Sequence, residues 1–511
     1  MHKLIRCRFI LCLVAIAATV FALQAAAASK PNPSAEFRAR KPSILFILVD
    51  DQRHDSLGCA GHPILKTPNI DRLAAQGVRF EKMFVTTSIC MASRASIFTG
   101  LTETGHGYTG GGPPATPVIT QDVDTSFPIL LREAGYRTGF FGKQHVRFQE
   151  GNTKAMNRMF DVHGRIGRKP YFKKQPDGSR RHEAELIGDR SVEFLNGQSA
   201  DRPFCLYMSF NTSHAEDGDK RPGVGHFPWP KAVDGMYEDT VPAPPRLGAP
   251  KYFEALPAFL QKSMNRARWH WRWDTPEKYT INMRAYLRML TGMDRVVGRV
   301  TQALADKGLA DNTVVIYTAD NGYYMGDRGF AGKWSHFEES LRVPLIIHDP
   351  RLPEEKRNRL EKAPVLNIDL PATMLELAGI GVPKKYQGRS VLSVFNGKTP
   401  DDWRTDHFHE HLRDNPAPVP KWRGVRDGRY TYARYFGQNP VHEFLHDRKV
   451  DPDQIRNFAD DPEYKEVLDK LRARCDEFTT QYTRPEIVAF KKAELAKPRR
   501  PKRTRRKNVK K

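Results

Sequence analysis

The chain has 511 residues, and its 82 Lys and Arg outnumber 59 Asp and Glu to give a formal net charge of +23. Its six cysteines show no close spacing, which argues against a disulfide-stapled scaffold and against a zinc site built on cysteines. Whether two of the three cysteines Cys59, Cys205 and Cys475 form a disulfide is not decided by the sequence. The length is sufficient for one large α/β domain with a smaller companion.

The first 28 residues have the form of a secretory signal peptide. Lys3, Arg6 and Arg8 precede an apolar run over residues 9–23, and small residues follow up to Ala28. The run is short for a bilayer span, so a retained membrane anchor is the weaker alternative. We therefore predict cleavage after Ala28, export to the periplasm or the medium, and no membrane span after cleavage.

An unbroken apolar run at residues 43–49 ends in Asp50 and Asp51. Such a run is typical of a strand buried on both faces of a parallel sheet. Acids at its C-terminal end would lie at the edge where open α/β sheets carry their ligands, although a helix N-cap would also explain them. A helix closed by Gly77 is predicted at residues 69–77.

Residues 86–101 contain the cysteine on which the prediction of function depends. Small and hydroxylated residues lead to Cys90, and the apolar run after it closes at Gly100, which predicts a short helix with Cys90 at its N-terminus. Backbone N–H groups and the helix dipole favour an anion there, and Arg94 adds a planar fork suited to a tetrahedral oxyanion. For this motif alone, a small buried cysteine would be the better interpretation.

Strands and helices alternate over the next 240 residues or so. We predict helices at residues 127–134, 279–305 and 368–377, and strands at residues 135–142, 203–210, 312–318 and 343–347. Polar residues follow the strands or lie in the loops beyond them: Lys143, His145, His214, Asp320, Asn321 and Lys333. Lys143 and His145 are two residues apart, so an extended segment would point both the same way. Residues 215–280 look irregular.

This alternation predicts a doubly wound α/β sheet flanked by helices, with its site along one edge. A looser region holds short strand candidates such as 430–436 and a charged helix at 462–482, which predicts a smaller C-terminal α+β subdomain. We expect a catalytic domain at 40–399, the subdomain at 400–485, and a basic disordered tail at 486–511. The order of the strands cannot be read from the sequence.

The end of the chain is strongly basic, with ten Lys or Arg and no acid over residues 497–511. Such a run is typical of disorder. It is either a solubilising tail or a segment that holds polyanions by counterion release.

Four residues at the ends of two strands offer only oxygen ligands: Asp50, Asp51, Asp320 and Asn321. Hard oxygen donors suit Ca²⁺ or Mg²⁺, whereas catalytic zinc would call for histidine or cysteine in these places. We therefore expect one hard divalent cation, Ca²⁺ with Mg²⁺ as the alternative.

The stretch Cys90-Met91-Ala92-Ser93-Arg94 resembles the C-x-[PA]-S-R signature of the type I formylglycine-dependent sulfatases, and the resemblance extends over roughly residues 42–480. In that family the cysteine is oxidised after translation to formylglycine (3-oxoalanine), which implies a formylglycine-generating maturation enzyme as a partner. The resemblance also implies an alkaline-phosphatase-like core, a C-terminal subdomain on a small antiparallel sheet, and calcium bound by the four oxygen-ligand residues together with residue 90.

The resemblance assigns a role to each remaining site residue. Asp320 would take a proton from the hydrated formylglycine, which then attacks sulfur. Arg94, Lys143 and Lys333 would stabilise the sulfate oxygens. His214, with Lys333 as a possible helper, would protonate the leaving alcohol, and His145 would deprotonate the second hydroxyl to expel sulfate.

The expected substrate is a sulfated carbohydrate, either a polysaccharide or a glycosaminoglycan fragment, because residues 329–334 and 338–344 look like the carbohydrate-acting branch of the family. Trp269, Trp271 and Trp273 suit stacking on sugar rings, or else core packing. Weaker candidates for substrate contact lie at residues 410–411 and 423–426. The alternatives are a phosphate or phosphonate ester hydrolase of the same superfamily and a non-catalytic polyanion-binding protein. We do not expect nucleic acid as a partner.

Overall fold

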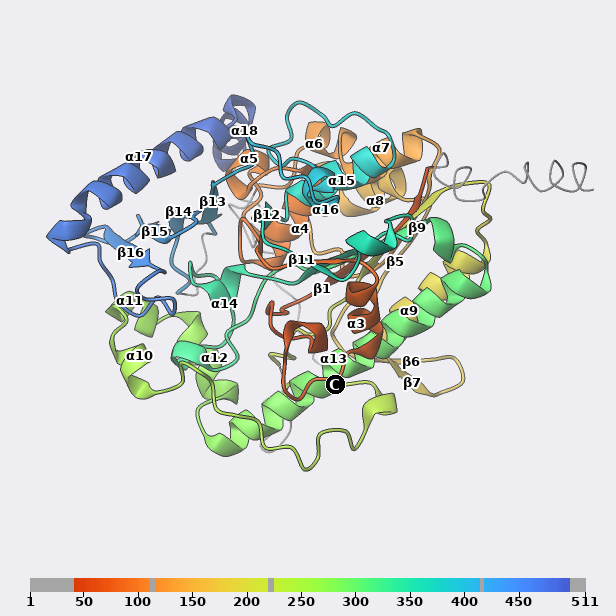
Figure 1. Cartoon of the computed structure of the whole chain (residues 1–511), viewed down its shortest axis with the longest axis horizontal. Helices are drawn as coiled ribbons and strands as arrows, with labels where there is room; N and C mark the ends of the chain where they lie inside the picture. The colour runs from red at the N-terminus through yellow and green to blue at the C-terminus, as the bar shows by residue number, and fades with distance from the viewer. Residues whose placement is uncertain (1–40, 111–115, 219–224, 414–417, 497–511) are drawn as a thin grey trace, which may run out of the picture. The chain divides into compact units, whose positions relative to one another are not determined.

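A computed structural model describes residues 41–110, 116–218, 225–413 and 418–496 (Figure 1). The predicted signal peptide and the basic run at 497–511 lie outside these residues. The described residues from Pro42 onward belong to one compact unit. Among them, none of the helices combines the length and the apolar character that a membrane span requires.

The core of this unit is a mixed sheet in which the described strands follow the order β11-β2-β10-β9-β1-β8-β4-β5. Neighbouring strands run parallel except at β10, which is antiparallel to both β9 and β2. Their bounds are β1 Ser43–Val49, β2 Val78–Phe80, β4 Arg137–Gly142, β5 Val162–Arg165, β8 Phe204–Ser209, β9 Thr313–Ala319, β10 Leu345–His348 and β11 Arg359–Glu361.

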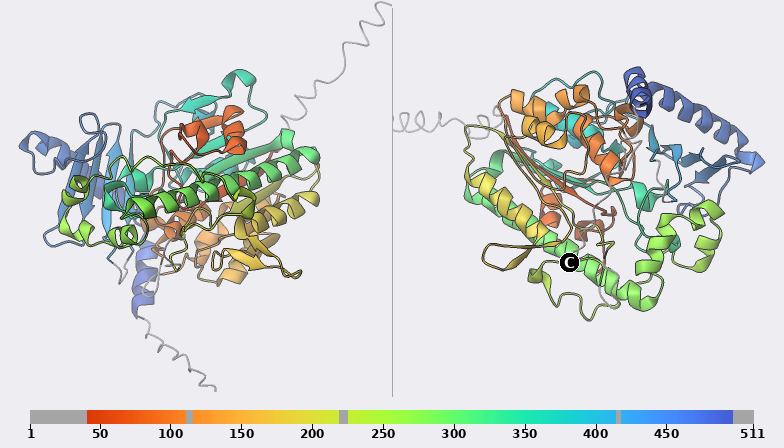
Figure 2. Two further views of the ribbon diagram at one scale, coloured as in Figure 1. Left: turned by 90° about the horizontal axis from the view of Figure 1, so that it is seen from below. Right: turned by 180° about the vertical axis from the view of Figure 1, so that it is seen from behind.

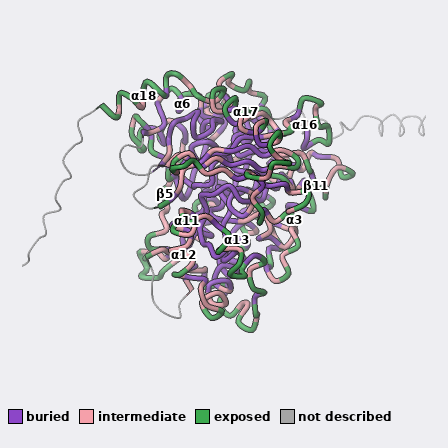
Figure 3. The backbone as a smooth tube through the Cα atoms, turned by 90° about the vertical axis from the view of Figure 1, so that its left-hand side faces the viewer, coloured by how far each residue is buried: buried purple, intermediate pink, exposed green. Residues whose placement is uncertain are grey.

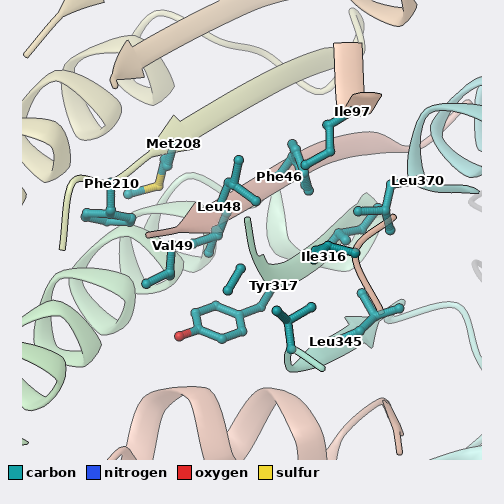
Figure 4. Close-up of a cluster of buried hydrophobic side chains, with 14 of the residues drawn as sticks. Phe46, Leu48, Val49, Ile97, Met208, Phe210, Ile316, Tyr317, Leu345 and Leu370 are labelled. Atoms are coloured by element: carbon teal, nitrogen blue, oxygen red, sulfur yellow. The ribbon is translucent and has the colours of Figure 1, made fainter. Parts of the chain in front are cut away.

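The register of the two central strands places the polar residues that follow them. All seven residues of β1 are buried, as its apolar sequence predicts. Val49 at the end of β1 pairs with Ala319 at the end of β9. Asp50 and Asp320 therefore leave the sheet side by side. Figure 4 shows buried hydrophobic side chains of these strands and their neighbours, including Phe46 and Ile316, gathered in one cluster.

Helices cover both faces of the sheet (Figures 1 and 2). Contacts join α13 to α9 and α3 on one face and join α15 to α4 and α7 on the other. An apolar stripe of α13 that includes Tyr286, Leu290, Met293 and Val297 is buried, and Thr275 caps the first turn of the helix. The bounds are α3 Pro68–Ala75, α4 Cys90–Thr99, α5 Glu103–His106, α6 Thr120–Asp124, α7 Phe127–Glu133, α8 Asn152–Met159, α9 Glu183–Asn196, α13 Pro276–Asp306, α15 Asp369–Leu377 and α16 Leu392–Phe395.

The described part of residues 215–280, a range predicted to be irregular, contains three short α-helices before α13 begins. They are α10 Pro250–Glu254, α11 Ala258–Gln261 and α12 Met264–Arg272, and α14 Glu338–Leu341 follows later in the chain. Short paired strands complete the core: β3 Met83–Phe84 with β12 Val365–Leu366, and β6 Phe172–Lys174 with β7 Arg180–His182. Single 3-10 turns lie at Gly58–Ala60, Lys231–Val233, Ala310–Asn312, Asp327–Gly329, Glu354–Lys356 and Pro462–Tyr464.

A separate antiparallel sheet forms the C-terminal part, in the order β13-β14-β15-β16. Its strands are β13 Asp406–His411, β14 Trp422–Asp427, β15 Tyr430–Tyr435 and β16 His442–Asp447, and helix α17 Lys465–Tyr482 packs on one face. Trp422 and Tyr435 join the main core instead. The small antiparallel sheet implied by the resemblance is confirmed.

The chain continues as helix α18, Pro485–Ala496, where the sequence suggested the start of a disordered tail. Ile487 of this helix is buried against Gly107, and Arg484 just before it pairs with the buried Asp122. These contacts outweigh the polar composition that led to the prediction. Figure 3 shows the buried segments gathered in the interior, with exposed segments along outer helices such as α18. All four described cysteines are free thiols.

Candidate active site

Cys90 is the first residue of α4, preceded by the extended residue Ile89. Its side chain is 5 % exposed, and its Sγ lies 3.3 Å from His145 Nδ1. The three free N–H groups of the first turn and the helix dipole therefore act on whatever the side chain of residue 90 carries. The predicted loop-to-helix transition is present as expected.

Arg94, one turn later on α4, is fully buried. Its Nε donates to Asp320 Oδ2 at 2.7 Å, and its two Nη atoms donate to the carbonyls of Lys143 and Phe210 and to the hydroxyl of Ser209. Four of its five N–H donors thus have protein acceptors. The guanidinium holds Asp320 and links the ends of β4, β8 and β9, and its predicted role in binding sulfate oxygens stays a prediction.

The acids form a buried group at the ends of β1 and β9. One ligand atom each from Asp50, Cys90 and Asp320 lie within 4.8 Å of one another. Asp51 N contacts Asp320 Oδ1 at 3.4 Å, and Asn321 Nδ2 donates to Asp51 Oδ1. The register of the two parallel strands brings these residues together.

Three oxygens of this group are buried without a hydrogen-bond partner: Asp50 Oδ1, Asp51 Oδ2 and Asn321 Oδ1. A buried carboxylate or amide oxygen left unpaired costs free energy unless a cation or donor meets it. An all-oxygen donor set of this kind fits a hard divalent cation. The structure therefore offers an acidic group that could hold a metal ion, and the identity of that ion stays a prediction.

Basic side chains surround the acids. Lys143 Nζ pairs with Asp50, Lys333 Nζ pairs with Asp51, and His214 Nε2 lies 3.7 Å from Asp51 Oδ2. Burial alone would raise the pKa of Asp50, but the charges of Lys143, His214 and Lys333 hold it well below its usual range. Asp50 is therefore ionised at neutral pH.

Asp320 differs from Asp50 although the two lie side by side. Burial and the negative charge of Asp50 raise the pKa of Asp320 to about 8, against the opposing effect of Arg94. His214 Nδ1 lies 2.7 Å from the carbonyl of Ala215, which makes Nδ1 the protonated nitrogen and leaves Nε2 to face Asp51. Burial lowers the pKa of His214 to about 3.

The backbone is strained at three non-glycine residues of the site. Asp51, His145 and Trp334 have φ values of 56°, 52° and 79°, in the left-handed region that side chains disfavour. Such strain persists only where the surroundings impose it, and it clusters at functional sites. Lys143 and His145 converge because of this turn at His145, and not because of the extended segment predicted for them.

A continuous set of contacts links all ten predicted site residues. Sequence reasoning missed Ser209, although a polar residue that ends the apolar run of β8 could have indicated it. It also missed Arg168 and Asp217, which lie near His214 in segments without any recognisable pattern.

Two groups of weaker candidates for substrate contact, the tryptophans near residue 271 and residue Glu410, make contacts within the protein itself. Trp273 is buried against Phe227, and Trp269 packs against the core, so these aromatics are not one exposed row. The helical period of α12 turns alternating residues to different faces. Glu410 is buried and accepts from Thr104 N at 2.6 Å, which joins the C-terminal sheet to the core.

Comparisons with known proteins agree with this geometry. Residues 42–380 match the sulfatase family model, and residues 326–481 match the model named N-sulphoglucosamine sulphohydrolase, C-terminal. The chain is 26% identical to the N-acetylglucosamine-6-O-sulfatase of Bacteroides thetaiotaomicron, over 89% of each protein. It is also 26% identical to the N-sulphoglucosamine sulphohydrolase of Homo sapiens, over 88% of this chain and 92% of that protein.

Among solved structures, one in complex with its substrate D-glucosamine-2-N,6-O-disulfate superimposes with a TM-score of 0.69. It is 24% identical and covers 87% of this chain and 98% of its own. This likeness shows a shared fold.

Proposed function

The chain belongs to the sulfatase family, and we propose that this sulfuric ester hydrolase removes sulfate from a sulfated carbohydrate. The observation that carries the proposal is the start of α4, where Cys90 of the C-x-A-S-R stretch lies against Asp50 and Asp320. Both curated relatives described above are named for sulfated glucosamine substrates, which supports a carbohydrate as the alcohol part.

We propose that residue 90 is converted to formylglycine by a maturation enzyme. The hydrate of this aldehyde supplies a hydroxyl nucleophile and, unlike serine or cysteine, a second hydroxyl that lets the aldehyde re-form when sulfate leaves. His145 Nδ1, 3.3 Å from the side chain of residue 90, is placed to accept a proton there. Asp320 is the acidic side chain next to residue 90, and Arg94 holds its Oδ2 in place.

One hard cation, Ca²⁺ with Mg²⁺ as the alternative, would be held by Asp50, Asp51, Asp320 and Asn321 together with residue 90. When bound, such an ion withdraws electron density from sulfate oxygens and stabilises the negative charge of the transition state. Lys143 and Lys333 hold Asp50 and Asp51, and their ammonium groups lie where further negative charge would be stabilised.

His214 is the proposed acid toward the leaving alcohol, with Lys333 beside it. Because Nδ1 donates to the Ala215 carbonyl and burial keeps the resting ring neutral, Nε2 must first take up the proton that it then passes to the leaving alcohol. Both His214 and Lys333 contact Asp51, so their donors converge on one side of the acidic group.

The remaining parts of the proposal concern the whole chain. We propose export with removal of residues 1–28, a catalytic domain at 40–399, and a C-terminal subdomain at 400–485, within which the small sheet begins at Asp406. The basic residues 497–511 would either solubilise the enzyme or hold polyanionic substrate.

Turnover of matched esters tests the reaction. One preparation should hydrolyse an aryl sulfate and a sulfated glucosamine with a kcat/KM well above that for the corresponding aryl phosphate. A preference for the phosphate would favour the phosphate or phosphonate ester hydrolase instead. Loss of all detectable function on removal of residues 497–511 would favour the polyanion-binding protein.

A further inference from the structure

Three arginines gather beside His214, and the proposed reaction uses none of them. Arg268 Nη2 lies 2.9 Å from Asp217 Oδ2, Arg168 Nη2 lies 3.6 Å from the same oxygen, and Arg272 Nη2 pairs with Asp217 Oδ1. We call Arg168, Arg268, Arg272 and Asp217 the arginine cluster. Its residues come from a loop after β5, from α12, and from the segment that follows His214.

The arginine cluster has an excess of positive charge. Among the described residues, the other acid in contact is Glu216, 3.5 Å from Arg168, so three guanidinium groups meet two carboxylates there. The side chain of Arg272 is fully buried, whereas those of Arg168 and Arg268 remain 20% and 14% exposed. These two can therefore be reached by a ligand, and Arg268 Nε is buried without a hydrogen-bond partner. Such a donor is stabilised when an acceptor arrives.

The arginine cluster adjoins the groups that face the leaving alcohol. Arg168 Nη1 donates to the Ala215 carbonyl at 3.1 Å, the same carbonyl that His214 Nδ1 contacts. The guanidinium of Arg268 lies over the ring of Trp334, 4.7 Å from its centroid, and Trp334 follows Lys333 directly in the chain. Arg168 therefore adjoins His214 at its Nδ1 side, and Arg268 adjoins the residue that follows Lys333.

We propose that Arg168 and Arg268 form a subsite for a second oxyanion on the substrate, either a carboxylate or another sulfate. This anion lies on the sugar that loses its sulfate or on the adjoining sugar. The planar guanidinium forks match the oxygens of either group, and Asp217 positions them. The inference rests on the proposed function, since it specifies the carbohydrate as one with at least two anionic groups.

Pairs of substrates that differ by one anion test this subsite. N-acetylglucosamine 6-O-sulfate is compared with D-glucosamine-2-N,6-O-disulfate, and a sulfated disaccharide containing a uronate is compared with its carboxyl-reduced form. An aryl sulfate serves as the singly charged reference. The wild-type enzyme should prefer the doubly charged member of at least one pair, and that pair identifies the anion as sulfate or carboxylate.

Arg268→Gln should lower kcat/KM for the preferred doubly charged substrate by about 10- to 100-fold, mainly through KM, because a charge-assisted hydrogen bond is lost. The loss for the aryl sulfate should be several times smaller, and Arg268→Lys should fall between. The matched control is Arg266→Gln on the same helix, since Arg266 packs over Phe253 and Trp269 instead. It should leave the substrate preference unchanged.

Each remaining outcome decides against the subsite. Equal losses on all substrates in Arg268→Gln would indicate a structural role, and no loss would exclude Arg268. A wild-type enzyme that hydrolyses the aryl sulfate but shows no preference for a second anion would overturn the subsite and leave the sulfatase activity standing. Inactivity toward every sulfate ester would overturn the proposed function itself. If Arg268→Gln does not fold, Arg168→Gln carries the same prediction and the same outcomes.

Discussion

Lys333 and His336 lie three residues apart on one loop, and each belongs to a different buried polar group. The two groups differ in how their hydrogen bonds are satisfied. Around Lys333, three acidic and amide oxygens have no partner and the backbone of Trp334 is strained. Around His336, every ring nitrogen is paired: Nδ1 with Tyr435 OH at 2.8 Å and Nε2 with His446 Nε2 at 3.1 Å. His446 Nδ1 in turn donates to the Arg456 carbonyl.

This difference indicates different roles: the acidic group is a candidate functional site, whereas the histidine network is structural. The histidine network joins the core to β15 and β16 and needs nothing further, so its role is to hold the C-terminal sheet in place. The acidic group contains buried oxygens without a hydrogen-bond partner. Its strained backbone persists because the surrounding structure imposes it, as is common at functional sites. Between these two groups, the unpaired buried oxygens are what distinguishes the candidate site from the structural network.

Removal of divalent ions should abolish the activity that depends on the acidic group and leave the hydrogen bonds of the histidine network unchanged. Dialysis against a chelator is expected to reduce sulfate release to background and to lower the thermal midpoint, because an ion that binds only the folded state stabilises it. Ca²⁺ or Mg²⁺ should restore both readouts. Restoration by Zn²⁺ alone would contradict an all-oxygen ligand set.

Replacing the proposed acid should affect substrates unequally. His214→Ala is expected to lower kcat for a sugar sulfate by about 100-fold or more, but to have a much smaller effect on an activated aryl sulfate, whose leaving group needs no proton. The exposed His270 on α12 supplies the control, and His270→Ala should change neither rate. Equal losses on both substrates would remove His214 from this role.

Breaking the histidine network should cost stability instead. His446→Phe leaves the His336 Nε2–H group and the Arg456 carbonyl unpaired, which is expected to lower the free energy of unfolding by about 1–3 kcal/mol. Chemical denaturation measures this loss, with His270→Phe as the exposed control. An unchanged midpoint in His446→Phe would show that the network contributes nothing to stability.

The same variant should change how stability depends on pH. Burial lowers the pKa of His446 from 6.5 to about 3, so below pH 6.5 the unfolded chain binds a proton that the folded chain excludes. Stability from this group is thus full above pH 6.5 and is lost as pH falls toward 3. His446→Phe should make the decline shallower by about 1.4 kcal/mol per pH unit. Parallel curves for the two proteins would contradict a neutral buried His446.

Much of the sheet edge that carries the predicted site residues could be predicted from local sequence patterns. The apolar run at 43–49 predicts β1 because a strand buried on both faces needs no alternation, and the acids after β1 and β9 follow from strand ends. The turn at His145 and the helix of α12 could not be read, since their conformations are imposed by packing. Arg168 and Asp217 approach His214 only in three dimensions, so no local spacing reveals them.

The central claim is that residue 90 is an aldehyde in the active enzyme. Protein produced with a maturation enzyme should yield a peptide about 18 Da lighter at residue 90 than the thiol form, detected by mass spectrometry. The fraction converted should track specific activity across preparations, and Cys90→Ala should be inactive although Asp50 and Asp320 are unchanged. An active enzyme that contains only the unmodified thiol at residue 90 would contradict the account.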